Sequence, residues 1–519
     1  MKLEAKERRW LGIASLGVVL LTSLPYLVAF LSQGENWYFS GFLIGVEDGN
    51  SYIAKMLRGA QGDWLFRSPY STLPQTGALL YWPYLLLGKL IGPSASHQSY
   101  LLTFHIFRLF SNLALCFATY VFIARIVKQL YLRRAAWLIA LLGGGLGWLL
   151  IAAGQSDFLG SIPLEFYSPE SFGFLALFTF PHLSLGRALM LLALLIYLAP
   201  MEATHSEWQT TLLWLALALV HILSAGIALL LVGSHWLFTR LWCKRPRTDN
   251  LSELELGQLL WPVLGAGFPL LYNLVVFVHD PYLPAWSQQN LIVSPHPLHY
   301  LLAYGLLLPF AWLGARALRS RQTEGGQFLA HWLILAALLL LIPFGLQRRL
   351  AEGIWVAIVV LAVAAFDGAD GLRLNRWRWS LAAVFPSTLM LLAVSAQFAA
   401  EPRPPAFLES NLAFALEGME GFTNENDVML APFELGNTLP AFTPLRVVIG
   451  HGPESVGLDN LQGGVEGVLD GQLSQGDLAF LNAHQVRFVL APEMIHDSAA
   501  VHLIKTYPQA GLWLYAVNP

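Results

Sequence analysis

The chain has 519 residues, of which 56% are hydrophobic and only 12% are charged, about half of the roughly 25% charge found in ordinary soluble domains. This composition excludes a typical soluble enzyme. The net charge is −3, and no basic block with interleaved aromatic residues occurs, so the sequence does not indicate nucleic acid as a partner. The two cysteines, Cys116 and Cys243, lie in or beside apolar segments and do not form a disulfide framework.

Apolar segments long enough to cross a bilayer as helices recur up to about residue 400. The first, 11–31, follows four basic residues; it is too long for the apolar region of a signal peptide and lacks an A-x-A cleavage site. The sequence therefore predicts a polytopic α-helical membrane protein with about eleven spans. The other ten are expected near 99–124, 135–153, 184–200, 209–223, 225–241, 259–278, 298–315, 328–345, 353–366 and 380–398.

Charge placement predicts the orientation of these spans. Basic residues concentrate in 125–134, 240–247, 316–321 and 373–378, whereas 154–183 and 279–297 contain no Lys or Arg. By the positive-inside rule, the N-terminus is expected in the cytoplasm, here of a bacterial plasma membrane. The acidic turn 201–208 breaks the pattern, and 209–223 with 225–241 could instead be one broken helix.

The composition changes after residue 400, where Glu401-Pro402-Arg403-Pro404-Pro405 forms a polar, proline-rich hinge. Short apolar runs at 428–431, 446–449, 486–490 and 512–517 are typical of strands, and 471–484 is typical of a helix. We therefore expect two domains, a transmembrane domain over 1–400 and a small soluble α/β domain over 401–519. An odd number of spans places the second domain outside the cytoplasm.

The segment 32–98 is the first external loop in this topology, and it is too long to be a simple connection. It contains Glu47-Asp48 at the expected end of the first span. Adjacent carboxylates near a membrane surface suit a general base or metal ligands. The alternative interpretation is a helix N-cap with a solvated neighbour.

The residues after Glu47 favour a specific family. Asp48-Gly49-Asn50-Ser51-Tyr52-Ile53-Ala54-Lys55-Met56-Leu57, then Gly62-Asp63-Trp64-Leu65, Pro69-Tyr70 and Leu80-Tyr81-Trp82, resemble the first external loop of the membrane-embedded GT-C glycosyltransferases. Within that superfamily, the pattern looks most like the protein mannosyltransferase and aminoarabinose transferase branch. The resemblance is close over 40–92 and only architectural elsewhere.

The resemblance implies that Asp48 is the catalytic base, that Glu47 supports it, and that Tyr52 lies in the substrate cleft. An acidic residue often follows the base in the family, whereas this chain has Gly49. A divalent metal, Mg or Mn, is therefore an open question.

A transferase that uses a lipid-phosphate sugar also needs positive charge to stabilise the leaving phosphate. Arg348 and Arg349 lie between the spans 328–345 and 353–366 on the expected external face, against the positive-inside rule. The resemblance implies that they bind the donor phosphate. Alternatively, they are interfacial arginines that contact lipid headgroups.

The second external segment, 155–183, contains Glu165, Glu170 and His182. Acidic residues of this loop face the first loop in the family, so Glu170 and His182 are expected to bind the sugar or orient the acceptor. A solvated loop with an interfacial histidine is the equal alternative. The segment Gly450-His451-Gly452-Pro453-Glu454 is interpreted as a strand-to-loop turn that could also cap the cleft.

Together these features predict an inverting glycosyltransferase. It would transfer a sugar from a polyprenyl-phosphate donor to a lipid, glycan or protein acceptor on the extracytoplasmic side, surrounded by membrane lipid. The alternative is a transporter or flippase for a lipid-linked saccharide, which should show paired repeats. The sequence contains no convincing internal repeat.

Overall fold

The computed structural model describes residues 3–199, 206–242, 253–321, 323–367, 374–419, 421, 423–496 and 500–518. Its contacts form two compact units. The first unit contains Met1–Leu24, Phe107–Leu271 and Ile292–Val394; the second contains Pro25–Ile106, Tyr272–Leu291 and Ser395–Pro519. The expected division at residue 400 stays a prediction, because these units group the first loop with the C-terminal region.

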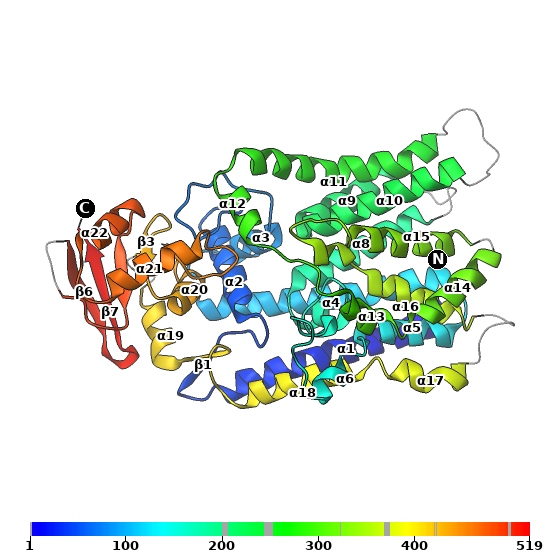
Figure 1. The fold of residues 1–519 in the computed structure, drawn as a ribbon, viewed down its shortest axis with the longest axis horizontal. Coiled ribbons are helices and arrows are strands. Elements are labelled where there is room, and N and C mark those ends of the chain that lie inside the picture. The colour runs from blue at the N-terminus through cyan, green and yellow to red at the C-terminus, as the bar shows by residue number, and fades with distance from the viewer. Residues whose placement is uncertain are drawn as a thin grey trace. The chain divides into compact units, whose positions relative to one another are not determined.

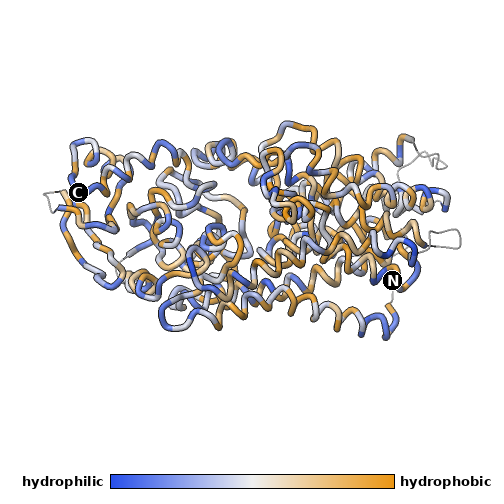
Figure 2. The backbone as a smooth tube through the Cα atoms, turned by 60° about the horizontal axis from the view of Figure 1, so that its bottom comes forward, coloured by the Kyte–Doolittle hydropathy of each residue, from blue (hydrophilic) through white to orange (hydrophobic). Residues whose placement is uncertain are grey.

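Long apolar helices confirm the membrane-protein class. Five helical segments in the described part of the chain are long and apolar enough to cross a bilayer, or six if one pair bent by 66° counts as one span. Figure 2 shows that the helices of the first unit are mostly hydrophobic. The five are α1 (Ala5–Ser32), α4 (His97–Ile126), α10 (Ile222–Trp242), α11 (Glu253–His279) and α17 (Leu374–Ala382) with α18 (Pro386–Ala400); the bent pair is α13 (Pro297–Tyr304) with α14 (Leu308–Ser320).

Each of the eleven expected segments contains helix, but the count of eleven spans is not confirmed. The segment 135–153 divides into α5 (Leu130–Leu142) and α6 (Trp148–Ala152). The glycines between them leave the helix because Gly144 N–H donates to Val384 O at 2.7 Å. A Cβ on Gly145 would lie 2.5 Å from Ala303 Cα, so glycine allows close packing at this position. The expected basic residues 244–247 and 373 and most of the turn 201–208 lie outside the described residues.

The core of the first unit surrounds α16 (Ile354–Ala364), in which every residue is buried. Helices α5, α14 and α15 (Glu324–Leu339) pack against it. A Cβ on Gly314 of α14 would lie 1.8 Å from Leu361 O, so glycine lets these two helices touch. The described part of this unit also contains the helices α7 (Gly173–Phe178), α8 (Pro181–Tyr197) and α9 (Glu207–Val220) and the 3₁₀ turns η1 (Leu164–Phe166) and η2 (Gln347–Ala351).

In the second unit, two helices of the first loop pack closely. Helix α2 (Val46–Ala60) contacts α3 (Trp82–Ile91). A Cβ on Gly88 would lie 1.7 Å from Met56 O, and a Cβ on Gly59 would lie 2.1 Å from Leu85 O. Neither position accepts a side chain, which fixes α2 against α3. The same unit contains α12 (Tyr282–Gln289) and the antiparallel pair β1 (Trp37–Phe39) and β2 (Phe407–Glu409).

A five-stranded sheet forms the C-terminal part of this unit, in the order β4-β3-β5-β7-β6 (Figure 1). The expected strands are confirmed as β3 (Val428–Leu430), β4 (Arg446–Val447), β5 (Phe488–Ala491) and β7 (Leu512–Val517). Strand β6 (Val501–Tyr507) was not expected; it is an edge strand with mostly exposed side chains. The helices are α19 (Ser410–Glu417), α20 (Phe433–Phe442), α21 (Leu458–Leu469) and α22 (Gln475–Ala483).

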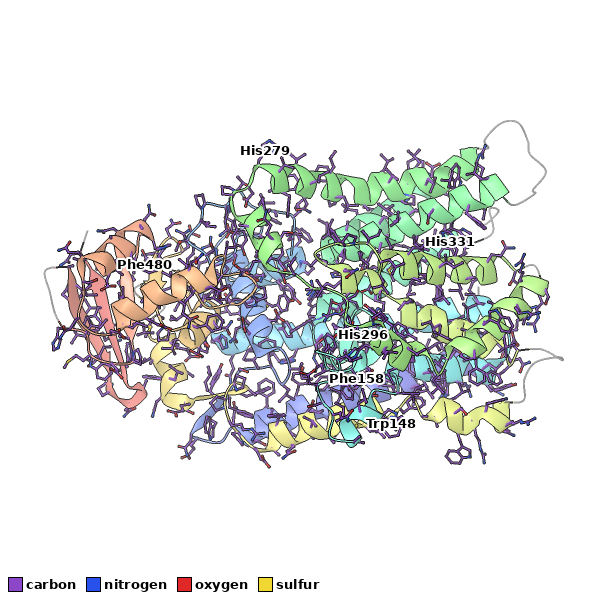
Figure 3. The ribbon with its side chains drawn as sticks, viewed as in Figure 1. Trp148, Phe158, His279, His296, His331 and Phe480 are labelled. Atoms are coloured by element: carbon purple, nitrogen blue, oxygen red, sulfur yellow. The ribbon has the colours of Figure 1, made fainter. Side chains whose placement is uncertain are left out.

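Helices α21 and α22 contact each other through an aromatic residue placed over a glycine. Phe480 of α22 is marked in Figure 3. A Cβ on Gly464 of α21 would lie 2.4 Å from a ring carbon of Phe480, so the ring occupies the space a side chain would need. The expected helix at 471–484 is thereby confirmed, with its start fixed by a Ser474–Asp477 capping box.

Candidate functional site

The acidic pair of the first loop begins helix α2. Gly45 is the N-cap, in the left-handed region at φ 64°, so the interpretation of Glu47 or Asp48 as the N-cap is wrong. Both carboxylates lie in the first turn, where the helix dipole stabilises negative charge. The side chain of Asp48 is 51% exposed, whereas Gly49–Gly59 are all buried. The Asp48 carboxylate is therefore the accessible acid of this helix.

A loop of the C-terminal region contacts both acids. It runs from Val448 to Gly457, between β4 and α21. The buried imidazole of His451 places Nε2 3.3 Å from Asp48 Oδ1. The next residue, Gly452, donates its backbone N–H to the carboxylate of Glu47. Residues far apart in the sequence thus meet within one unit.

Glu454 anchors the same loop inside the protein. Its Oε1 lies 2.6 Å from Lys55 Nζ, and the two side chains are only 4% and 1% exposed. Ser51 Oγ donates to Oε1 at 2.7 Å and Ser68 Oγ donates to Oε2 at 2.6 Å. Burial raises the pKa of Glu454, but the charge of Lys55 and the hydrogen bonds from Lys55 and Ser68 outweigh it and lower the pKa to about 2. Glu454 is therefore a buried anion that stabilises the loop.

Further hydrogen bonds hold the backbone of the loop. Ser455 Oγ accepts from the N–H groups of Gly450 and His451 at 3.0 and 3.1 Å. Gln289 of α12 donates to the carbonyl groups of Gly452 and Ser455, both at 2.9 Å. The loop is held at both ends and in the middle, so the His451 ring has a defined position.

Tyr52 lies on α2 behind the acidic pair. Its side chain is buried at 8% exposure and stacks on Tyr84 of α3, with ring centroids 4.6 Å apart. Lys55 Nζ lies 5.3 Å from the Tyr52 ring centroid and 4.4 Å from that of Tyr81. The aromatic group around Lys55 therefore includes Tyr52, whose part in a substrate cleft stays a prediction.

The residues around Asp48 do not fit a divalent metal. No group of three or more His, Cys, Asp or Glu suitable for a metal ion occurs in the part of the chain that the structure describes. A Cβ on Gly49 would lie 2.3 Å from the Phe42 ring, so no second carboxylate fits after Asp48. The Glu47 carboxylate already accepts the Gly452 N–H. Among the residues that the structure describes, Asp48 therefore lacks the neighbouring oxygen ligands that Mg or Mn requires.

In the first unit, the second group of expected residues forms a partly buried ionic cluster. Arg349 Nε lies 3.0 Å from Glu170 Oε1, and Glu170 is 3% exposed. Arg187 of α8 lies 2.9 Å from Glu352, with both side chains almost fully buried. Arg187 also donates to the carbonyl groups of Pro169 and Glu170. Arg187 thus connects the 169–170 segment to the end of η2.

Arg348 and His182 flank this cluster. The Arg348 guanidinium lies 4.4 Å from the Tyr167 ring centroid, and within the described ranges it has no carboxylate partner. Counting Arg187, Arg348 and Arg349 against Glu170 and Glu352 gives the cluster one excess positive charge. His182, in the first turn of α8, is buried and lies 5.7 Å from the His221 ring. The structure brings Glu170 and Arg349 together, whereas His182 packs on another histidine.

Sequence reasoning missed several members of both groups. His451 and Glu454 lie in a segment rich in glycine and proline, which predicts a turn and no particular role for either side chain. The sequence also indicated no role in binding or catalysis for Glu352. The partner of Arg187 in the structure is Glu352, which is distant in sequence. The available signal was an ionisable residue in an apolar segment, which requires a partner.

Comparisons with known proteins identify the fold. No protein-family model and no curated protein matches the sequence. Among solved structures, the oligosaccharyltransferase of Archaeoglobus fulgidus in the apo form superposes with a TM-score of 0.51 at 12% identity, covering 92% of this chain and 69% of that one. The same enzyme in complex with an inhibitory peptide and a dolichol-phosphate gives a TM-score of 0.50 at 12% identity, covering 94% and 70%.

The arabinofuranosyltransferase AftD from Mycobacteria superposes with a TM-score of 0.53 at 16% identity. This chain is covered completely but spans only 40% of AftD. Both similar proteins are GT-C glycosyltransferases, and neither distinguishes the branch expected from the first loop. The likeness over nearly the whole chain shows that this chain has the fold that these two glycosyltransferases share.

Proposed function

We propose that the protein is a glycosyltransferase that takes a sugar from a polyprenyl-phosphate donor and delivers it to an acceptor on the extracytoplasmic side of the membrane. The observation that carries this proposal is the half-exposed Asp48 carboxylate, held by a buried histidine at the start of α2 in a GT-C fold. An accessible carboxylate with one oxygen hydrogen-bonded is suited to accept a proton from a hydroxyl group.

In the proposed reaction, the acceptor oxygen attacks the anomeric carbon of the donor sugar. Its proton passes to Asp48 as the new C–O bond forms. The bond between the anomeric carbon and the phosphate oxygen breaks, and polyprenyl phosphate leaves with the electron pair. A single displacement inverts the anomeric configuration, and the leaving phosphate needs neutralisation of its charge instead of a proton.

Positive charge for the phosphate is proposed to come from Arg348 and Arg349. Their cluster has one excess positive charge, and Arg348 lacks a carboxylate partner within the described residues. Guanidinium groups match phosphate oxygens in geometry as well as charge. The dolichol-phosphate bound by the similar archaeal oligosaccharyltransferase supports a donor of the lipid-phosphate class.

The other predicted site residues are proposed to support the base or to bind the substrate. Glu47 is proposed to support Asp48 electrostatically, because its carboxylate holds the Gly452 N–H next to the His451 contact. Tyr52, Glu170 and His182 are proposed to shape the substrate cleft. The about eleven spans, the cytoplasmic N-terminus, the bacterial plasma membrane and the external C-terminal domain belong to the same proposal. The sugar and the acceptor (lipid, glycan or protein) are unspecified.

The test is transfer of radiolabelled sugar from a panel of polyprenyl-phosphate hexoses and pentoses, in membranes with matched expression. Wild type should transfer from at least one donor, Asp48→Asn should lose transfer, and Arg348→Ala/Arg349→Ala should weaken donor binding. Full transfer by Asp48→Asn would show that the base is elsewhere. Movement of labelled lipid across the bilayer without transfer from any donor would favour a flippase.

A further inference from the structure

We infer that His451 is a positioning residue for the proposed base: its neutral imidazole donates Nε2–H to Asp48 and orients the carboxylate for proton transfer. This inference rests on the proposed function, because it assigns a role beside Asp48. It places part of the reaction site in the C-terminal region, in a loop that the sequence alone indicated only as a turn.

The hydrogen bonds of the ring define its tautomer. The backbone N–H of Glu454 donates to His451 Nδ1 at 3.2 Å. A nitrogen that accepts a hydrogen bond carries a lone pair, so in the neutral ring the proton is on Nε2. Nε2 faces Asp48 Oδ1 at 3.3 Å. His451 is therefore arranged as a hydrogen-bond donor to the Asp48 carboxylate. In this tautomer, His451 cannot accept a proton from Asp48 through Nε2.

The surroundings fix the direction of this donor. His451 is 2% exposed, and the Tyr70 ring packs on it with centroids 5.3 Å apart. Its backbone N–H is held by Ser455, and the loop continues directly to Glu454, which is anchored by Lys55. A rotation of the ring would break the hydrogen bond from the Glu454 N–H to Nδ1, and this N–H would then keep only its bond to the His451 carbonyl oxygen at 3.1 Å.

Asp48 is fixed at one oxygen and accessible at the other. Among the described residues, its Oδ1 has His451 as partner and its Oδ2 has no hydrogen bond. A half-exposed aspartate without a partner would occupy several rotamers, and only some would point Oδ2 at the acceptor hydroxyl. The His451 contact selects one of them, and correct orientation of a catalytic group raises the rate of the chemical step without changing substrate binding.

Two substitutions separate this role from a structural one. His451→Gln keeps an amide N–H near the position of Nε2 and can still donate to Asp48. His451→Asn keeps an oxygen near the position of Nδ1 and can still accept from the Glu454 N–H, but it cannot reach Asp48. Thr72→Val serves as the stability control, because it removes the contact between Thr72 Oγ and His484 Nδ1 at 2.9 Å, away from Asp48.

The experiment measures kcat and KM for the donor used by wild type, together with thermal unfolding midpoints in detergent. We expect His451→Asn to lower kcat about 10-fold to 100-fold, the loss of a hydrogen bond to a charged group, with KM within about 2-fold. His451→Gln should retain kcat within about 3-fold. Thr72→Val should retain the kcat of wild type even if its thermal unfolding midpoint is lower.

Three outcomes would overturn the inference. Asn and Gln variants with wild-type kcat, while Asp48→Asn is inactive, would leave the proposed function standing and remove the role of His451. A higher kcat for Asn than for Gln would assign the histidine to the turn. A wild type inactive with every donor, or a fully active Asp48→Asn, would overturn the proposed function and this inference with it.

Discussion

The buried pair of Lys55 and Glu454 gives the sharpest prediction of stability. Lys55→Met keeps the length and apolar stem of the side chain but removes its charge. Glu454, 4% exposed, then retains only its hydroxyl donors and the neighbouring histidine. Removal of one partner from a buried ion pair costs about 3–5 kcal/mol, because the other charge stays buried.

The pKa of Glu454 gives an independent magnitude. It falls from an ordinary value of 4.5 to about 2 despite burial. Since a tenfold change in an equilibrium constant corresponds to about 1.4 kcal/mol, folding favours the ionised form by a net free energy of about 3 kcal/mol after the cost of burial. Since the folded pKa is lowered, wild type has this stabilisation in full above pH 4.5 and loses it as the pH falls toward about 2.

The variant should respond to pH in the opposite direction. Without Lys55, burial is the largest remaining influence and raises the pKa of Glu454, so protonation on acidification relieves the buried charge. We expect Lys55→Met to be destabilised by about 3 kcal/mol at pH 8 and by clearly less at pH 5. The assay is equilibrium unfolding of purified protein in mixed micelles at both pH values.

A double-mutant cycle completes this test. Glu454→Gln leaves Lys55 buried and unpaired, and Lys55→Met/Glu454→Gln leaves no buried charge at either position. The double variant should therefore be destabilised by less than the sum of the single variants, with a coupling of about 1–3 kcal/mol. Additive effects, or a loss below about 1 kcal/mol at pH 8 for Lys55→Met, would show that the pair does not stabilise the loop.

Two further predictions concern the surroundings of Asp48. Gly49→Ala should lower stability by about 1–3 kcal/mol in unfolding assays, because its Cβ would lie 2.3 Å from the Phe42 ring. Gly463→Ala is the control, since no described atom lies within 4 Å of that Cβ and an exposed helical alanine should stabilise; equal effects would contradict the packing argument. Treatment with EDTA should leave sugar transfer within about 2-fold, because the donor set around Asp48 lacks the ligands for a divalent ion. A loss restored by Mg or Mn would refute that reasoning.

The helices of the protein could be predicted from its sequence, because a helix that crosses a bilayer needs about 20 consecutive apolar residues. Segments such as 99–124 and 259–278 became long helices with nearly the expected bounds. The rule fails where the backbone leaves the helix for local reasons. After α5 the N–H groups of Gly144 and Leu146 donate to the carbonyl groups of Val384 and Leu302 on other segments, and hydropathy does not report such partners.

The candidate site could be predicted only in part from the sequence. Asp48 could be singled out because its helix carries a local pattern of neighbours. His451 could not, since the property that matters is a contact with a residue 403 positions away. Its own neighbours, two glycines and a proline, are typical of any turn. Without aligned relatives, a sequence shows residue types and spacing, but it does not show which distant segments meet.

The long separation between the partners of the second unit has a consequence for biosynthesis. Lys55 and Glu454 are 399 positions apart, and Asp48 and His451 are 403 apart. After a ribosome has added Lys55, it must add 399 more residues before the chain contains Glu454. Until then, Lys55 of α2 has no carboxylate of Glu454 to pair with, and Asp48 has no histidine to fix its orientation. The contacts that hold α2 and orient Asp48 therefore form only after the C-terminal region has been synthesised.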